Sequence, residues 1–202
     1  MLDIAAKAKL SFDRYMPGKK IVLQKCVANR LVIVLSGEVE LNSESPCHRF
    51  RTLEFTRKPP LIGLESMFSL RQEYPCSVIA RTAVETMCVE KSDLRDLLLS
   101  YPVIRLNVLT QLSRQATQLR LRLCSSLPLT IEERFIRFVQ HRLLVPVGAK
   151  MLKCRLTDLA TELGVTRLRL SGALHKLQDE GLVEMGRSHI VIPNFERLLA
   201  KL

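Results

Sequence analysis

The spacing of apolar residues changes near residue 91, from short alternating runs to a helical period. Six runs rich in β-forming residues precede this point, and turn residues separate them. The expected strands are Lys20–Gln24, Leu31–Leu35, Glu38–Leu41, Phe50–Phe55, Ser77–Arg81 and Thr86–Glu90. Ser36-Gly37 predicts a hairpin turn between the second and third of them. Such a series favours a small antiparallel barrel or jelly roll, a fold that can hold a ligand, although many such barrels hold none.

The helical period begins at Ser92. Ser92 and Asp93 are expected to cap a helix that ends at Tyr101-Pro102. A longer helix is expected from Val103 to about Cys124. Its small and apolar residues recur at spacings of three and four, at Leu109, Leu112, Ala116, Leu119 and Leu123. This heptad seam predicts a parallel homodimer interface. The alternative is a helix docked on its own barrel, a role that Leu106 and Leu121 could serve.

Residues Leu156–Leu177 predict two short helices joined by a tight turn. Thr157 and Asp158 can cap the first helix, and Gly164 stands where a helix commonly ends in a left-handed residue. Thr166 can cap the second helix, whose apolar stripe is Leu170, Ala173, Leu174 and Leu177. The pattern is that of a helix-turn-helix whose second helix enters the DNA major groove. An ordinary helical hairpin in a protein core would show the same spacing.

The sequence after these helices favours the DNA-binding interpretation. The run Leu182–Met185, the turn Gly186-Arg187-Ser188 and the alternating run His189–Ile192 predict a small hairpin, or wing. A wing attached to a helix-turn-helix is more specific than either part alone. Upstream, Thr130 and Glu133 predict a capping box at the start of another helix.

Composition agrees with a DNA-binding role without proving it. The 202 residues carry a net charge of +11, with 47% apolar and 25% charged residues. These values describe a globular chain of one or two domains with a polyanionic partner, although a basic surface can also serve solubility alone. No apolar run is long enough for a membrane span, and charged residues interrupt the N-terminus where a signal peptide would be apolar. We therefore expect a cytoplasmic protein without a membrane partner.

The remaining side chains indicate neither a metal site nor an enzyme. Six scattered cysteines lack C-x-x-C spacing, and the four histidines lack any metal-binding motif. The cysteines are expected to be reduced packing residues, and a redox role for one of them stays open. Neither paired carboxylates, a nucleophile with its base, nor a phosphate loop appears, so we expect no catalytic residue. An enzyme or signalling module built on the barrel is the rival class.

In these features the chain resembles the Crp/Fnr family of bacterial transcription regulators over nearly its whole length. The residues that carry the resemblance are Leu35-Ser36-Gly37-Glu38-Val39, Leu61-Ile62-Gly63, Ala80-Arg81-Thr82, Leu159 to Arg167, Leu177 to Val183, and the wing. The resemblance implies an α+β fold with an N-terminal antiparallel jelly-roll β-barrel, a long dimerisation helix and a C-terminal winged helix-turn-helix. The corresponding segments are 1–91 for the sensor barrel, 92–127 for the dimerisation helices and 128–202 for the DNA-binding domain.

The barrel departs from the cyclic-nucleotide-binding members of this family. Those members hold the ribose with a glutamate after the Ile-Gly pair, and the phosphate with an arginine some ten residues later. Leu64 and Tyr74 stand at these positions here. A cyclic phosphate needs positive charge or free N–H groups, so cyclic AMP is not the expected ligand and the effector is unknown. The candidate effector pocket comprises Gly63, Leu64, Glu65, Arg71, Tyr74 and Cys76. The cysteine cluster of iron–sulfur members is absent, and no motif supports haem at His48.

The second helix of the helix-turn-helix also departs from the family pattern. The candidate DNA-binding residues are Thr166, Arg167, Leu168, Arg169, Ser171, Gly172, His175 and Lys176. Thr166 and Arg167 match the family and are expected at a guanine edge or at phosphates. Leu168 and Gly172 replace the base-reading glutamate and arginine. Leu168 could meet a thymine methyl, Gly172 allows close approach, and His175 could compensate one turn along. Arg169 is expected to contact phosphate.

These observations predict a homodimeric transcriptional regulator that binds a palindromic operator unlike the usual family site. Its barrel would sense a signal other than cyclic AMP and change the long helix. The alternative is a constitutive repressor or architectural dimer with a ligand-free barrel. A filled barrel interior would favour this alternative, and an open polar pocket near Tyr74 would count against it. Activation would require a contact with RNA polymerase, for which no local pattern is evident.

Overall fold

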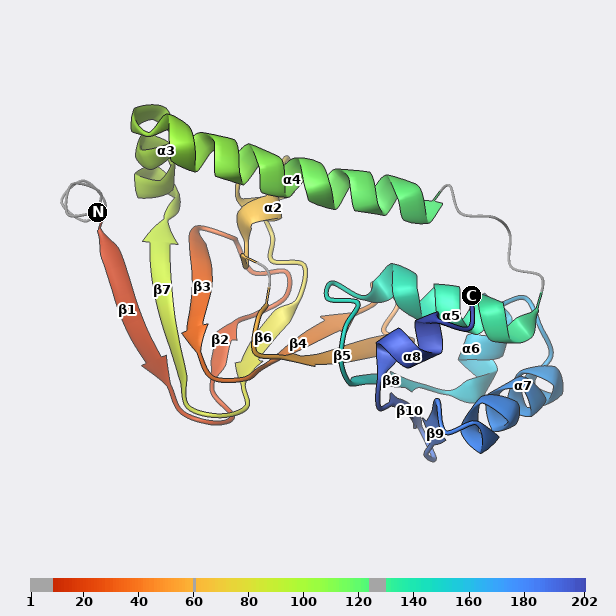
Figure 1. Ribbon diagram of the computed structural model, residues 1–202. Helices are drawn as coiled ribbons and strands as arrows, with labels where there is room; N and C mark the ends of the chain where they lie inside the picture. Colours follow the sequence, from red (N-terminus) through yellow and green to blue (C-terminus); the bar gives the residue numbers. More distant parts are fainter. Residues whose placement is uncertain (1–8, 60, 124–129) are drawn as a thin grey trace. The chain divides into compact units, whose positions relative to one another are not determined.

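The computed structural model describes residues 9–59, 61–123 and 130–202, and they form two compact units (Figure 1). The first unit takes in the described residues up to Glu38, from Arg57 to Pro75 and from Ala80 onward to the end of the long helix. The second unit contains Val39–Thr56, Cys76–Ile79 and the described residues of the C-terminal segment. The chain therefore passes between the units several times.

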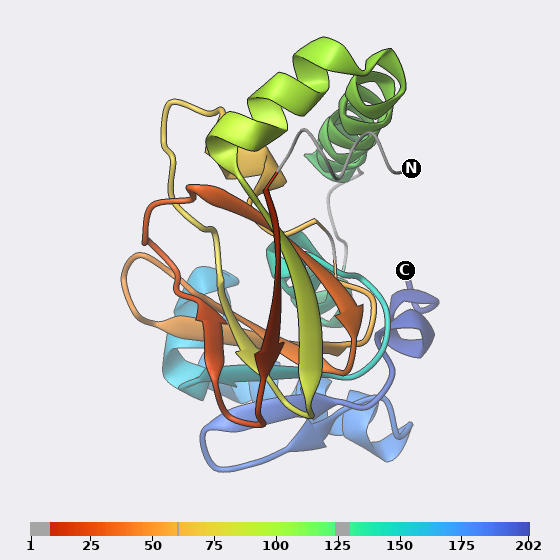
Figure 2. The ribbon, with the colours of Figure 1, turned by 90° about the vertical axis from the view of Figure 1, so that its left-hand side faces the viewer.

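The first unit is built on an antiparallel sheet of three strands in the order β1-β7-β3. These strands are β1 (Leu10–Tyr15), β7 (Val84–Glu90) and β3 (Arg30–Ser36), and Figure 2 shows them side by side. The short strand β2 (Lys20–Val22) and the short helix α2 (Leu64–Met67) belong to the same unit. Strand β1 was not expected from the sequence, since it is an edge strand whose Phe12 side chain is exposed.

Two helices complete the first unit. Helix α3 (Lys91–Ser100) begins directly at the end of β7, with Glu90 as N-cap and no side-chain cap. The prediction that Ser92 and Asp93 cap this helix is therefore wrong, because the helix starts before them. Helix α4 (Pro102–Leu123) follows, and Ile104, Val108 and Leu112 pack against a core that includes Leu94 and Leu97.

The predicted hairpin at Ser36-Gly37 is also wrong. Strand β3 pairs with β7, whereas β4 (Val39–Glu44) pairs with β5 (Phe50–Thr56). The chain does turn at this position, since Gly37 has a left-handed φ of 92°. A side chain there would also collide with the carbonyl oxygen of Ala83. The turn carries the chain from one sheet to another, a choice that local spacing does not reveal.

The second unit has its strands in the order β6-β4-β5-β8-β10-β9. Besides β4 and β5, these are β6 (Ser77–Ala80), β8 (Lys150–Cys154), β9 (Glu184–Met185) and β10 (His189–Ile192). Strands β9 and β10 pair antiparallel and form the predicted wing. The helices of this unit are α5 (Ile131–Arg142), α6 (Leu156–Glu162), α7 (Arg167–Asp179) and α8 (Phe195–Leu199). The predicted fold class is confirmed.

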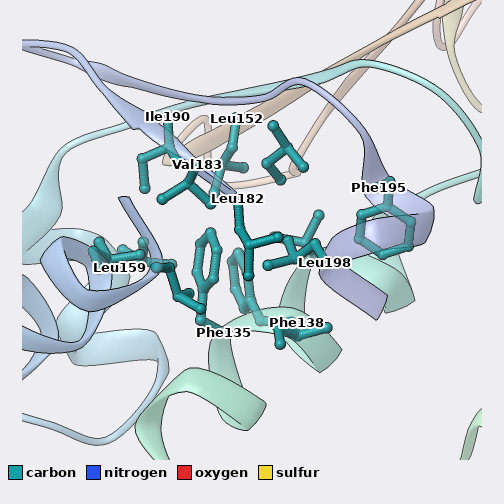
Figure 3. Packing of buried hydrophobic residues seen from close by; sticks show 14 of the residues in the cluster. Phe135, Phe138, Leu152, Leu159, Leu182, Val183, Ile190, Phe195 and Leu198 are labelled. Atoms are coloured by element: carbon teal, nitrogen blue, oxygen red, sulfur yellow. The ribbon is translucent and has the colours of Figure 1, made fainter. Parts of the chain in front are cut away.

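One hydrophobic core joins these helices to the sheet. Phe135 and Phe138 from α5 lie close to Leu152, Ile190 and Val183, and the side chains of Leu159, Leu182, Phe195 and Leu198 complete the cluster (Figure 3). The predicted stripe of α7, from Leu170 to Leu177, is buried in the same core. Because every second-unit helix contributes to this core, the orientation of α7 is determined by packing.

Some of the helix caps predicted from the sequence are present in the structure, and others are not. The Thr130–Glu133 capping box is present, and the Thr166 hydroxyl accepts a hydrogen bond from Arg169 N, as predicted. Helix α6 instead begins at Leu156, with Arg155 as N-cap and no side-chain cap. The predicted caps Thr157 and Asp158 lie inside its first turn, because β8 leads into the helix after a single residue.

Two glycines of the helix-turn-helix provide a test of this geometry. A Cβ at Gly164 or Gly172 would meet no atom within 4 Å, but only Gly164 has a left-handed φ, of +66°. Gly164→Ala is expected to lower the free energy of unfolding by about 1–2 kcal/mol. Gly172→Ala is expected to raise it by about 0.5–1 kcal/mol, because alanine favours the helix interior. Urea unfolding followed by circular dichroism measures both, and equal effects would contradict the geometry.

Candidate nucleic-acid interface

Helix α7 presents a polar, basic face opposite its buried stripe. Thr166, Arg167, Leu168 and Arg169 are exposed at its start, and Leu168 is exposed to 84%. Gly172, His175 and Lys176 continue this face in the next turns, with Ser171 half-buried beside them. The structure therefore brings all eight predicted DNA-binding residues to one side of the unit.

The start of α7 is held in place by backbone and side-chain hydrogen bonds. Val165 N donates to Ala160 O at 3.0 Å, which closes the turn between α6 and α7. The Arg134 guanidinium donates to Leu163 O at 3.4 Å, so α5 also supports this turn. The first turn of α7 holds no acidic residue. The positive end of the helix dipole and the arginines there favour a negatively charged partner.

An open groove of about 400 Å³ lies between the start of α5 and the face of α7. It is lined by Thr130, Ile131, Glu132, Arg169, Gly172, Ala173 and Lys176. The Lys176 ammonium lies 3.6 Å from a Glu132 carboxylate oxygen across this groove. Glu132 carries no signal in the sequence, since its partner lies more than forty residues away along the chain. Lys176 is therefore paired with a carboxylate in the free protein. Arg169 also lines this groove.

The predicted effector residues do not form one pocket. Gly63, Leu64 and Tyr74 are buried together in the first unit, and the Tyr74 hydroxyl donates to Arg30 O at 2.7 Å. Burial raises the pKa of Tyr74, which keeps this phenol protonated as a donor. Cys76 is buried in the second unit. Glu65 is exposed, and Arg71 forms an exposed ion pair with Glu73 at 3.1 Å.

A second open groove, of about 450 Å³, lies beside Tyr74 in the first unit. Its lining comprises Lys20, Ile21, Val22, Leu23, Cys26, Asn29, Arg30, Tyr74 and Glu90. The Arg30 guanidinium lies 3.7 Å from the Asp13 carboxylate, and Arg30 pairs with Glu90 across the β3–β7 ladder. Charged and apolar side chains both line the groove, and among the predicted effector residues only Tyr74 reaches it. Its other residues come from separate strands and loops, so no local sequence pattern marks them.

Helix α4 packs on its own unit and still leaves apolar side chains exposed. Of the predicted seam, Leu112 packs partly against the core, whereas Leu109 and Leu119 are 54% and 56% exposed. Ala116 is exposed between them, and the side chain of Leu123 lies outside the described part of the chain. Leu106 and Leu121, which were the alternative docking residues, are exposed instead. Docking on the first unit therefore uses mainly the face of Ile104 and Val108.

The described cysteines differ in exposure and in acidity. Burial raises the pKa of the Cys154 thiol to about 12 and also raises the pKa of Cys88, so both favour the inert thiol form. A hydrogen bond with Ser45 lowers the pKa of the exposed Cys47. Cys124 lies outside the described residues. Within the described ranges, no three histidine, cysteine or acidic side chains gather as a metal site would require.

Comparison with known proteins gives the same arrangement of parts. Residues 12–101 match the cyclic nucleotide-binding domain, and residues 108–201 match the Crp-like helix-turn-helix domain. The cyclic AMP receptor protein of Thermus thermophilus is 27% identical over 174 residues, which cover 85% of this chain and 79% of that protein.

No helix in the described part of the chain is long and apolar enough to cross a membrane.

Solved structures are similar along nearly the whole chain. The catabolite activator protein of Thermus thermophilus is 25% identical, with a TM-score of 0.51 and coverage of 98% of this chain and 92% of that one. The c-di-GMP responsive global regulator CLP of Xanthomonas campestris is 19% identical, with a TM-score of 0.53 and coverage of 95% and 97%. The second similarity is one of fold alone.

The packing between Gly63 and Tyr74 can be tested with a matched glycine. Gly63 and Gly18 both have left-handed φ angles, of +93° and +82°. A Cβ at Gly63 would lie 2.8 Å from the Tyr74 ring and 3.1 Å from Arg30 O, whereas one at Gly18 would meet nothing within 4 Å. Gly63→Ala is therefore expected to cost about 1–3 kcal/mol more in unfolding free energy than Gly18→Ala. Equal losses in chemical denaturation would show that Tyr74 does not pack there.

Proposed function

We propose that this chain, which belongs to the Crp/Fnr family of transcriptional regulators, binds a palindromic DNA operator as a homodimer and responds to a signal other than cyclic AMP. The observation that supports DNA reading most directly is the face of α7. Four apolar residues bury one side of the helix, and the arginines and Leu168 remain on the other. A recognition helix requires this division between packing and exposed residues.

Arg167 and Leu168 are the proposed base-reading residues. Arg167 can donate two hydrogen bonds to a guanine edge, and Leu168 can contact a thymine methyl in the major groove. Gly172, one turn further along, has open space around it and lets the helix backbone approach the bases. Thr166 supports the helix start through its cap, and His175 extends the same face. This set differs from the usual family set, so a different operator is expected.

The neighbouring cations are proposed to bind phosphates. Arg169 and Lys176 flank the reading face and line the groove next to α5. Phosphate contacts fix register and orientation without reading sequence. The Lys176–Glu132 pair would have to exchange its carboxylate for a phosphate oxygen. We therefore expect Arg169 to contribute more than Lys176 to the salt dependence of binding.

The exposed apolar residues of α4 are the proposed dimer seam. Leu109, Ala116 and Leu119 recur at heptad spacing and are exposed on the first unit. A second copy of α4 would cover them, and the two-fold axis would place two α7 helices in successive major grooves. Leu112 contributes to both surfaces, because it already packs partly on the core.

A responsive sensor is favoured over a constitutive one by the groove beside Tyr74. Tyr74 itself is buried against Gly63, at the position where the family places a phosphate-binding arginine, and this supports a signal other than cyclic AMP. The open groove nearby, which is lined by both charged and apolar residues, leaves room for another ligand. A constitutive repressor or architectural dimer with a ligand-free barrel is the second candidate. The burial of Tyr74 favours it, because this side chain fills space where a ligand could bind.

Genomic footprinting of the protein tests the proposed function. A recurring palindrome with half-sites about one helical turn apart is the expected result. Scattered binding that disappears at moderate salt would indicate phosphate attraction alone and would contradict sequence-specific regulation. The genes next to the recovered sites would indicate the signal.

Arg167→Ala tests the reading face. Loss of a bidentate guanine contact is expected to weaken binding to the recovered operator by about 1–3 kcal/mol and to relax specificity at one base pair. Arg197→Ala removes the same charge from α8 and serves as the control. Electrophoretic mobility shifts with both variants separate the two effects. Equal affinities of the two variants would remove Arg167 from the base-reading set.

Charged substitutions on α4 test the seam. Leu109→Glu and Leu119→Glu would bury unpaired charge between two helices, so each is expected to give monomers in sedimentation equilibrium. Leu121→Glu is the matched control, since Leu121 is also exposed on α4 but lies off the heptad repeat. A dimer that persists in both seam variants would place the interface elsewhere.

A further inference from the structure

The hairpin formed by β4 and β5 belongs to the DNA-binding unit, although its residues fall within the match to the cyclic nucleotide-binding domain. Strand β5 pairs antiparallel with β8, from Phe50 opposite Cys154 to Glu54 opposite Lys150. Strand β8 in turn pairs with β10 of the wing. The hairpin and the wing are therefore parts of one hydrogen-bonded sheet, with β8 between them.

Glu54 is the most deeply buried acid of this sheet. Its side chain is 0% exposed, and its two carboxylate oxygens accept hydrogen bonds from Leu144 N at 2.8 Å and Val145 N at 2.7 Å. The Lys150 ammonium, 1% exposed, lies 3.8 Å from the same carboxylate and donates to Val147 O at 2.6 Å. Charges buried to this degree require such partners, because desolvation would otherwise exclude them.

These bonds hold the segment that joins α5 to β8. Glu54 fixes its first residues, and the Glu196 carboxylate accepts a hydrogen bond from Gly148 N at 2.9 Å near its end. Burial lowers the pKa of Lys150, whereas Glu54 and Glu196 oppose that shift and favour its charged form. The segment thus rests on carboxylates from β5 and from the start of α8.

Aromatic packing attaches the other end of β5 to α5. The Phe50 and Phe138 rings meet edge to face with centroids 5.1 Å apart, and Phe50 lies in the core beneath α7. The Arg142 guanidinium lies 3.6 Å from the Phe138 ring centre and pairs with Glu162 of α6 at 3.0 Å. A displacement of β5 would therefore disturb α5 and α6 as well as β8.

We infer that Glu54 is a positioning residue for DNA binding. We also infer that the β5–β8 seam, by which we mean the antiparallel pairing of these two strands, is closed, with its strands paired, in the DNA-binding form of the protein. Glu54 holds the segment before β8, and β8 carries the wing on one edge and leads into α6 at its end. The hairpin is joined to the first unit by the chain at both ends. The inference rests on the proposed DNA binding.

The first experiment tests the seam without DNA. Arg51 and Lys153 are exposed, opposite residues of β5 and β8, and such pairs have the Cα separation that a disulfide needs. In the full chain, R51C/K153C is expected to form a cross-link between positions 51 and 153, identified by mass spectrometry of proteolytic fragments. E44C/K153C is the control, because Glu44 lies opposite Arg51 on β4, one strand further away.

We expect at least a tenfold higher cross-linked fraction for R51C/K153C than for E44C/K153C under the same mild oxidation. Equal, low fractions would show that the seam is open in solution and would overturn the inference. This result does not depend on whether the protein binds DNA, so it distinguishes failure of the seam from failure of the proposed function.

The second experiment tests the role of the seam in binding. A duplex selected from random-sequence DNA by the parent protein is the probe. Oxidised R51C/K153C is expected to bind it within about twofold of the reduced form. A tenfold or greater loss on oxidation, restored by reductant, would mean that the closed seam inhibits binding and would overturn the inference. Failure of the parent to select any sequence would count against the proposed function instead.

E54Q tests the positioning role, with E44Q as the half-buried control on the same hairpin. E54Q is expected to weaken binding to the selected duplex at least tenfold, and E44Q to change it less than twofold. Circular dichroism checks the fold of each variant. If E54Q fails to fold, E54Q/K150Q removes the unpaired buried ammonium and is expected to fold with the same loss of affinity. A folded variant at this position with parental affinity would overturn the assignment.

Discussion

The burial of one side of α7 determines which of its side chains can reach DNA. Its leucines pack in a core shared with Phe135 and Phe195, and complete burial of a leucine is worth about 1.5–3 kcal/mol. Rotation of the helix would bring these leucines into water. Arg167 and Leu168 therefore point outward because the opposite side is committed to the core, and the cap at Thr166 fixes where the helix begins.

The same core extends beyond the winged helix. Phe50 is part of it, and the adjoining β5–β8 ladder ends at the buried Glu54–Lys150 pair. Separation of the hairpin would expose an aromatic ring and leave a charge without its partner, both of which cost free energy. The two compact units are thus not divided at a single point along the chain. The assignment of sensing, dimerisation and DNA binding to residues 1–91, 92–127 and 128–202 stays a prediction.

Local sequence signals succeeded where the structure depends on neighbouring residues. The α7 stripe and the caps at Thr130 and Thr166 were predictable, because helical spacing and capping act within one or two turns. The expected caps of α3 and α6 were wrong since the preceding strands β7 and β8 run almost directly into these helices. Among the predicted sites, the DNA-binding residues lie together on one side of α7 while their role stays a prediction, and the effector residues are dispersed.

The sequence by itself determined most of the succession of strands and helices, with β1 as an exception, and the winged helix-turn-helix pattern and the residues on the exposed face of α7. Only the tertiary structure decided the strand partners, such as β3 with β7 and β4 with β5 in place of a hairpin at Ser36-Gly37. It also decided that Tyr74 packs against Gly63. The reason is physical: periodicity specifies which face of an element is buried, but a strand's N–H and C=O groups can bond to any strand brought alongside.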